Sequence, residues 1–268
     1  MTDMADNLRH CQAEITVAAE ILSDIQRQTL LEWLSSVDPS RNYNQAIKDR
    51  EKDTGQWFLD LDDFVNWLNT PGFIWIYGIP GSGKTVLSST IIETVRAVCE
   101  VCPDRRIAMF YFDFQEAEKQ EMKPFVRSLL RQLLAAESVV PEFVVKMHKT
   151  FKNSGQSPSV QDLESALVRV LEVSSKETYI ILDTIDEFPQ RSKSSKRREL
   201  LKFLQNMAKN HNSKLHILAA SRDETDIREV FQTISGHFIC LKAAKIDYDI
   251  LKYVKSCLVD GRSLPQFR

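Results

Sequence analysis

Two kinds of apolar pattern follow one another along the chain, and the first is helical. Over residues 5–36 the apolar side chains recur three or four positions apart, which predicts a helix that ends before Asp38-Pro39. Residues 39–56 are polar and are expected to form a linker. Helical spacing returns over residues 57–69 and stops at Thr70-Pro71-Gly72. Helical segments are therefore expected ahead of a separate main domain.

Beyond that break, short apolar runs of strand length alternate with helical patterns. Such runs are typical of buried strands, and helices between them indicate a parallel sheet covered on both faces. Right-handed crossovers then leave few possible topologies. The predicted strands are Phe73–Tyr77, Ile107–Phe112, Tyr179–Leu182, His216–Ala220 and His237–Leu241, and the predicted helices are 84–101, 120–136 and 159–173.

The composition is that of an ordinary globular domain. The chain has 268 residues, of which 43% are hydrophobic and 27% charged, and its 35 basic and 37 acidic residues leave a net charge of −2. This balance indicates neither a nucleic-acid partner nor a membrane surface. No apolar run approaches the roughly 20 residues that a membrane span requires. The polar, acidic N-terminus lacks the shape of a signal peptide, so a cytoplasmic location is expected.

The five cysteines are odd in number and scattered, which fits a reducing compartment. Cys99 and Cys102 form a C-x-x-C, but no second pair follows to complete a structural zinc site. Core or surface thiols are therefore expected at these positions, with metal or redox chemistry as the alternative.

A phosphate-binding loop is predicted between the first strand and the helix that follows it. Residues 78–85 match G-x-x-x-x-G-K-[ST] in full, in the strand–helix context that the motif requires. Its glycines allow backbone N–H groups to surround phosphate oxygens at a positively polarised helix N-terminus. We expect Lys84 to reach the β- and γ-phosphates of ATP and the Thr85 hydroxyl to ligate Mg²⁺. The predicted nucleotide-binding residues are Gly78, Ile79, Pro80, Gly81, Ser82, Gly83, Lys84, Thr85 and Val86.

Carboxylates cluster at the end of the third predicted strand. Asp183 follows the apolar run Tyr179–Leu182, at the carboxyl end of a strand, where α/β sheets place ligands. Together with Thr85, Asp183 is expected to hold Mg²⁺. Asp186 and Glu187 come just after it, and either one could be the general base that polarises the attacking water. The alternative is an acidic turn that caps the next helix.

Two further segments bring basic residues toward the predicted site. Arg222 follows the fourth predicted strand, and if that strand neighbours the first, its guanidinium can point at the γ-phosphate and stabilise the leaving phosphoryl group. A surface arginine after a strand is the alternative. The basic, serine-rich run 190–198 is expected to be a solvated loop, with a phosphate-sensing or regulatory loop as the alternative.

Together these elements resemble the NACHT branch of the STAND P-loop NTPases, and most closely the nephrocystin-like N-terminal NTPase domain of fungal ankyrin-repeat proteins. The Asp183–Glu187 run resembles that family's extended Walker B motif, and Ser221-Arg222 resembles its sensor arginine. Arg50–Phe58 and the tryptophan-bearing Phe64–Leu68 are similar to the stretch before the NTPase core, and Phe125–Leu133 to the helix after the second strand. The resemblance implies an α/β P-loop NTPase fold, a three-layer sandwich with a mostly parallel five-stranded sheet, preceded by an N-terminal helical segment.

The resemblance, which extends over roughly residues 45–255, also implies a function. It implies an ATP- or ADP-bound switch that uses Mg²⁺, self-associates on activation and signals through attached domains, which in fungi is linked to non-self recognition. Complete members continue through a helical domain, a winged helix and a repeat array, whereas only a short stretch follows the fifth predicted strand here. The expected divisions are an N-terminal helical segment, a linker with a pre-NTPase helix, the NTPase core and the start of a truncated helical region, at residues 1–38, 39–70, 71–245 and 246–268.

Several rival functions are compatible with parts of the sequence. A GTPase is disfavoured because Ala244-Lys245-Ile246-Asp247 lacks the asparagine of the guanine-reading N-K-x-D, and Asp183 is not followed by x-x-Gly. A small-molecule kinase would need a lid. The run 190–198 could be called one, but its position directly after the acidic strand end disfavours that interpretation. A nucleotide-stabilised adaptor would use the helix over 5–36 as its interaction surface. The loop itself could be a chance glycine-rich turn, or could bind nucleotide without hydrolysing it.

Overall fold

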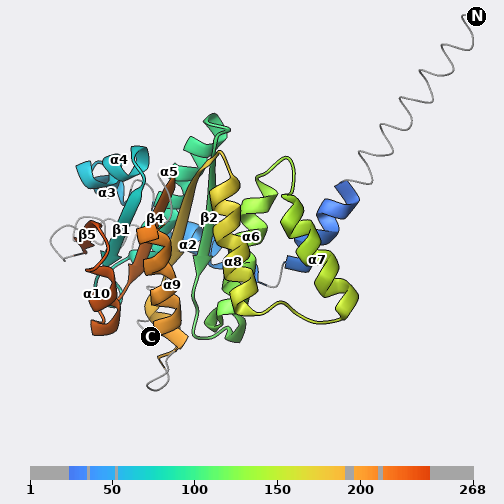
Figure 1. Ribbon diagram of the computed structural model, residues 1–268. Coiled ribbons are helices and arrows are strands. Elements are labelled where there is room, and N and C mark those ends of the chain that lie inside the picture. Colours follow the sequence, from blue (N-terminus) through green and yellow to red (C-terminus); the bar gives the residue numbers. More distant parts are fainter. Residues whose placement is uncertain (1–23, 35–36, 52–53, 191–195, 211–213, 242–268) are drawn as a thin grey trace, which may run out of the picture.

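The computed structural model describes residues 24–34, 37–51, 54–190, 196–210 and 214–241. Its strands are β1 Gly72–Tyr77, β2 Arg105–Tyr111, β3 Glu177–Asp183, β4 Leu215–Ser221 and β5 Gly236–Cys240. They form one sheet in the order β2-β3-β4-β1-β5, and every neighbouring pair is parallel (Figure 1). The predicted five-stranded parallel sheet is confirmed, with each strand within two residues of its predicted limits.

The strand order brings the predicted motifs to one edge of the sheet. Strand β4 lies between β1 and β3, with Tyr77 of β1 opposite Ser221 of β4. The Gly78 N–H donates a 3.3 Å hydrogen bond to the Ser221 carbonyl, so the two strand ends are joined directly. Arg222 is expected to reach the phosphates only if its strand neighbours the first strand. The structure meets this condition.

Helices flank the sheet in two layers. They are α2 Ser40–Asp49, α3 Gln56–Leu59, α4 Asp62–Asn69, α5 Lys84–Val101, α6 Met122–Ala135, α7 Glu142–Ser154, α8 Val160–Val173, α9 Lys196–Asn210 and α10 Thr225–Phe231, with short 3₁₀ turns η1 Ala117–Gln120 and η2 Ile185–Glu187. The predicted helices 84–101, 120–136 and 159–173 correspond to α5, α6 and α8. None of the helices within the described ranges combines the length and apolar character that crossing a membrane would need.

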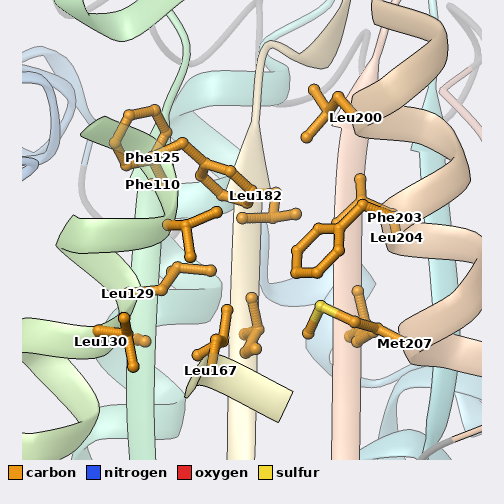
Figure 2. Packing of buried hydrophobic residues seen from close by; sticks show 14 of the residues in the cluster. Phe110, Phe125, Leu129, Leu130, Leu167, Leu182, Leu200, Phe203, Leu204 and Met207 are labelled. Atoms are coloured by element: carbon orange, nitrogen blue, oxygen red, sulfur yellow. The ribbon is translucent and has the colours of Figure 1, made fainter. Parts of the chain in front are cut away.

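Both faces of the sheet are buried because successive residues of each strand point to opposite sides. On one face Phe110 and Leu182 pack with Leu129 of α6, Leu167 of α8 and Leu204 of α9, as Figure 2 shows. The opposite face forms a second cluster with side chains from α2 to α5. The three-layer α/β sandwich is therefore confirmed.

The helical segment before the core packs on the domain. Residues 24–34 are helical. The remaining residues of the helix predicted over 5–36 lie outside the described residues. Leu30, Leu31 and Leu34 are buried in the same cluster as α6 and α8. The core therefore covers these three leucines, whereas Ile25, one turn earlier, is 56% exposed.

Part of the stretch expected to be a linker is helical. Residues 40–49 form α2, whose apolar face is Tyr43, Ala46 and Ile47 at helical spacing; this short pattern is a weak signal because the rest of the segment is polar. After it, Arg50 forms a 2.5 Å ion pair with Glu93 of α5. This stretch is therefore held against the helix that follows the phosphate loop, and it does not act as a free linker.

Candidate functional site

The loop between β1 and α5 has a backbone that depends on its glycines. Gly81 and Gly83 both have φ of 76°, in the left-handed region that glycine enters without steric cost. At Gly78 a Cβ would lie 2.9 Å from Ser82 Oγ, so a larger residue would clash. Helix α5 begins at Lys84, and the first N–H groups of a helix have no partner within it. The N–H groups at the start of α5 can therefore bind an anion, whereas those of Gly78 and Ser82 donate to the Ser221 and Ile79 carbonyls.

Lys84 lies against the carbonyl groups at the start of the loop. Its Nζ donates 2.9 Å hydrogen bonds to the carbonyls of both Gly78 and Ile79, and the residue is 9% exposed. Burial lowers the pKa of Lys84, while the carboxylates of Asp186 and Asp183 act in the opposite direction. A buried cation thus stands between the loop and the acidic strand end.

The other predicted loop residues differ in their surroundings. Ile79 is 73% exposed, and Pro80 is exposed beside it. Ser82 is buried, and its Oγ lies 3.3 Å from Lys84 Nζ. Thr85 and Val86, in the first turn of α5, are half-buried.

Asp183 is buried at the end of β3, beside α5. Its Oδ1 accepts a 3.0 Å hydrogen bond from the Ser88 hydroxyl, whereas its Oδ2 has no hydrogen-bond partner among the described residues. Burial raises the pKa of Asp183 to about 6, against the opposing effect of the Thr85 and Ser88 hydroxyls and the Lys84 ammonium. Mg²⁺ prefers oxygen ligands, and an unpaired buried carboxylate oxygen is costly without one. The residues present therefore fit a magnesium ion.

The turn after Asp183 joins the acidic residues to β4. Thr184 has φ of 56°, which is uncommon outside glycine, and its hydroxyl donates a 2.5 Å hydrogen bond to the Phe112 carbonyl. Asp186 Oδ1 accepts a 2.8 Å hydrogen bond from the Arg222 N–H, and Oδ2 lies 3.1 Å from Arg222 Nε. Both carboxylate oxygens of Asp186 are therefore engaged by the residue that follows β4, whose side chain is 49% exposed.

Glu187 has different surroundings from its neighbour Asp186. Its Oε2 accepts a 3.1 Å hydrogen bond from the Phe114 N–H, in the loop after β2. Burial raises the pKa of Glu187 to about 7, and nearby carboxylates add to the effect. Glu187 lines a cavity of about 260 Å³ together with Thr85 and Asp183, whereas Asp186 does not. The structure thus separates the two acidic residues between which the sequence could not choose.

Some residues of this cavity had not been expected from the sequence. Tyr111 and Asp113, at and after the end of β2, line it, and so does Asn42 of α2. Asn42 Nδ2 donates a 3.2 Å hydrogen bond to Asp113 Oδ2, and its Oδ1 accepts one from the buried Lys119. A polar residue directly after a predicted strand was a signal for Asp113. No local signal marked Asn42, since only packing brings α2 to this edge.

The basic run 190–198 does not form a solvated loop where it is described. Residues 191–195 lie outside the described residues, and α9 begins at Lys196. Arg197 is 4% exposed, donates a 2.7 Å hydrogen bond to the Phe188 carbonyl and pairs with Glu224. The prediction is wrong for Arg197 because its partners come from positions distant in sequence.

The C-x-x-C thiols are free and half-buried. Burial raises the pKa of Cys99 to about 11, and a thiol with a raised pKa is a poor nucleophile and metal ligand. Within the described residues no group of three or more His, Cys, Asp or Glu side chains is arranged to hold a metal. The geometry gives Cys99 and Cys102 no role in this site.

Two features define a domain of the P-loop NTPase type: an interior strand of a parallel sheet leads through this glycine loop into a helix, and a buried aspartate ends a nearby strand. The family profile described as Nephrocystin 3, N-terminal, matches residues 53–222, which is more than half of the chain. The chain belongs to this family. No curated protein matches it.

Solved structures with similar folds include two proteins of Aeropyrum pernix. The ORC2 protein is 18% identical with a TM-score of 0.44, covering 79% of this chain and 51% of that one. The ORC1 protein in complex with DNA is 14% identical with a TM-score of 0.48, covering 86% and 53%. A Walker-type ATPase of Pyrococcus abyssi is 10% identical with a TM-score of 0.49, covering 80% and 60%. This chain spans about half the length of the ORC chains.

Proposed function

We propose that this domain binds ATP together with Mg²⁺ at the carboxyl edge of the sheet and hydrolyses it slowly. The observation that carries the proposal is the shared cavity, in which Thr85, Asp183 and Glu187 meet from three segments of the chain. The glycine loop ends at the same place, where Thr85 occupies the first turn of α5. Thr85 therefore links the end of the glycine loop to a cavity that holds metal-binding oxygens and a carboxylate base.

Each group has a distinct role in the proposed reaction. The loop N–H groups and Lys84 bind the phosphates, and the oxygens of Thr85 and Asp183 hold Mg²⁺, which neutralises phosphate charge when bound. Glu187 accepts a proton from the attacking water as the water oxygen bonds to the γ-phosphorus and ADP leaves. Glu187 is preferred to Asp186 as the base because Arg222 engages both oxygens of Asp186.

Arg222 is assigned to stabilise charge on the γ-phosphate, with Asp186 as the residue that positions it. The ion pair and the backbone hydrogen bond hold the end of β4 against η2, beside the strand that leads into the loop. A guanidinium near the transferred group stabilises the charge that develops there. Asp186 thus acts through Arg222 rather than on the water.

The biological role that fits this chemistry is a nucleotide switch in a NACHT-type STAND signalling protein, with attached domains or further copies of the chain as partners. This part of the proposal is supported by the family's match over residues 53–222 and by the motif resemblance. A non-hydrolysing adaptor is the second candidate. Within the described part of the helix that would serve it, Leu30, Leu31 and Leu34 are covered by the core, which leaves the exposed Ile25 as the apolar residue available there.

Competition binding tests the proposal at the level of the nucleotide. We expect unlabelled ATP to displace labelled Mg-ATP more strongly than GTP does, because Ala244 stands where a guanine-reading motif has asparagine. GTP as the stronger competitor would show that the domain prefers guanine nucleotides and would contradict this expectation. Absence of any nucleotide binding by the folded wild-type protein would refute the proposal entirely.

The hydrolysis rate is expected to fall as the pH is lowered through about 7. Burial raises the pKa of Glu187 to about 7, and only the ionised carboxylate can accept a proton from water. The single-turnover rate at saturating Mg²⁺ should therefore rise with pH and level off above the pKa. In Glu187→Gln the residual rate should not follow this titration, and a wild-type rate that is independent of pH around neutrality would contradict the assignment.

A further inference from the structure

Two buried polar atoms without hydrogen-bond partners belong to residues that lie opposite each other at the end of the sheet. Tyr111 is the last residue of β2 and stands directly opposite Asp183 in the register with β3. Tyr111 packs in the cluster on the α5 side, and Asp183 accepts its hydrogen bond from Ser88 of α5, so both side chains lie on that face. Tyr111 Oη and Asp183 Oδ2 have no hydrogen-bond partner among the described residues, and both residues line the cavity.

The Tyr111 hydroxyl has no structural explanation in the nucleotide-free fold. The residue is 1% exposed, so its hydroxyl has given up water without gaining an acceptor, which costs free energy. A phenylalanine would bury the same ring without that cost, as Phe110 and Phe112 do at the adjacent positions. By contrast Tyr179, buried on the same face, donates a 2.7 Å hydrogen bond to the Leu68 carbonyl.

We propose that Tyr111 is a positioning residue for hydrated Mg²⁺, its hydroxyl holding a water ligand of the ion next to Asp183; this inference rests on the proposed function. Mg²⁺ usually keeps several of its waters in protein sites, and each of these needs hydrogen-bond partners. A phenol both donates and accepts, so it can bind such a water and orient it toward the unpaired Asp183 Oδ2. The hydroxyl then serves the ion, at a cost to the ion-free fold.

The test compares two substitutions that each remove one phenolic oxygen, Tyr111→Phe and Tyr179→Phe. For each protein, ATP affinity is measured by calorimetry with Mg²⁺ and with EDTA, and the melting temperature is measured without nucleotide. In Tyr111→Phe we expect the gain in ATP affinity caused by Mg²⁺ to shrink by about 3- to 10-fold, the value of one hydrogen bond. Its melting temperature should rise by about 2–4 °C, because an unpaired buried group has been removed.

The control should behave in the opposite way. Tyr179→Phe loses a formed hydrogen bond, so its melting temperature should fall while the effect of Mg²⁺ on ATP affinity stays that of wild type. If Mg²⁺ raises the ATP affinity of wild type and raises that of Tyr111→Phe by the same factor, the inference is overturned and the proposed function stands. If wild type itself shows no Mg²⁺-dependent ATP binding, the proposed function fails and the inference falls with it.

Discussion

Replacing Glu187 by glutamine is expected to slow single-turnover ATP hydrolysis by about 10²–10⁴-fold while leaving ATP affinity near that of wild type. Glutamine keeps the size of the side chain and can accept the 3.1 Å hydrogen bond from the Phe114 N–H, so the cavity wall should be preserved. What it loses is the carboxylate, which has a pKa of about 7 and faces the same cavity as Thr85 and Asp183. Excess protein over ATP makes a slow rate measurable.

Asp186→Asn is the matched control for Glu187→Gln, since it makes the same chemical change at the next residue. Asparagine can still accept the 2.8 Å hydrogen bond from the Arg222 N–H, but the ion pair with Arg222 Nε is lost. We therefore expect a smaller loss of rate than in Glu187→Gln, and one that keeps the pH dependence set by Glu187. A larger loss of rate in Asp186→Asn would indicate that Asp186, and not Glu187, is the general base. Wild-type rates in both variants would indicate that the acidic pair forms only a structural turn.

Replacing Lys84 by methionine is expected to weaken Mg-ATP binding by about 10- to 100-fold, the value of one or two charge-assisted hydrogen bonds. Methionine keeps most of the buried stem but removes the ammonium that lies at the Gly78 and Ile79 carbonyls. The loop then loses the cation that both binds phosphate and ties its first residues to α5. Calorimetric titration gives the dissociation constant, and the thermal stabilisation by Mg-ATP should shrink in parallel.

Lys146→Met controls for the loss of a positive charge elsewhere. Lys146 is 71% exposed on α7, where it pairs with Glu142 at helical spacing, so its replacement should leave the dissociation constant of Mg-ATP unchanged. Equal dissociation constants in wild type and a folded Lys84→Met would exclude a phosphate-binding role for Lys84. A parallel loss in Lys146→Met would instead indicate a general effect of charge.

The strands and the phosphate loop could be predicted because their signals are local. A buried strand in a parallel sheet needs an unbroken apolar run, and the loop needs glycines at particular positions, as Gly81 and Gly83 show by their positive φ. Asp183 could be placed at a strand end for the same reason. Helix α2 was not predicted, although Tyr43, Ala46 and Ile47 are at helical spacing, because three apolar positions in a polar segment are a weak signal beside its overall polarity.

The choice between Asp186 and Glu187 needed the tertiary structure. They are adjacent in sequence, and their surroundings differ only because β4 brings Arg222 to one and the loop after β2 brings Phe114 to the other. Arg197 shows the same dependence. A charged run predicts a solvent-exposed segment, and only the tertiary structure shows that Arg197 is paired with Glu224, which is distant in sequence.

The sequence alone therefore determined the α/β class, the strand positions and the loop, because local spacing and backbone conformation decide these features. Tertiary structure decided which side chains share the cavity, since strand order and register bring together residues that lie far apart along the chain. Tyr111 illustrates the difference. Its sequence position is that of one more apolar residue in a strand, and only the register with β3 sets it opposite Asp183. The missing hydrogen-bond partner of its hydroxyl can be recognised only once every neighbour has been placed.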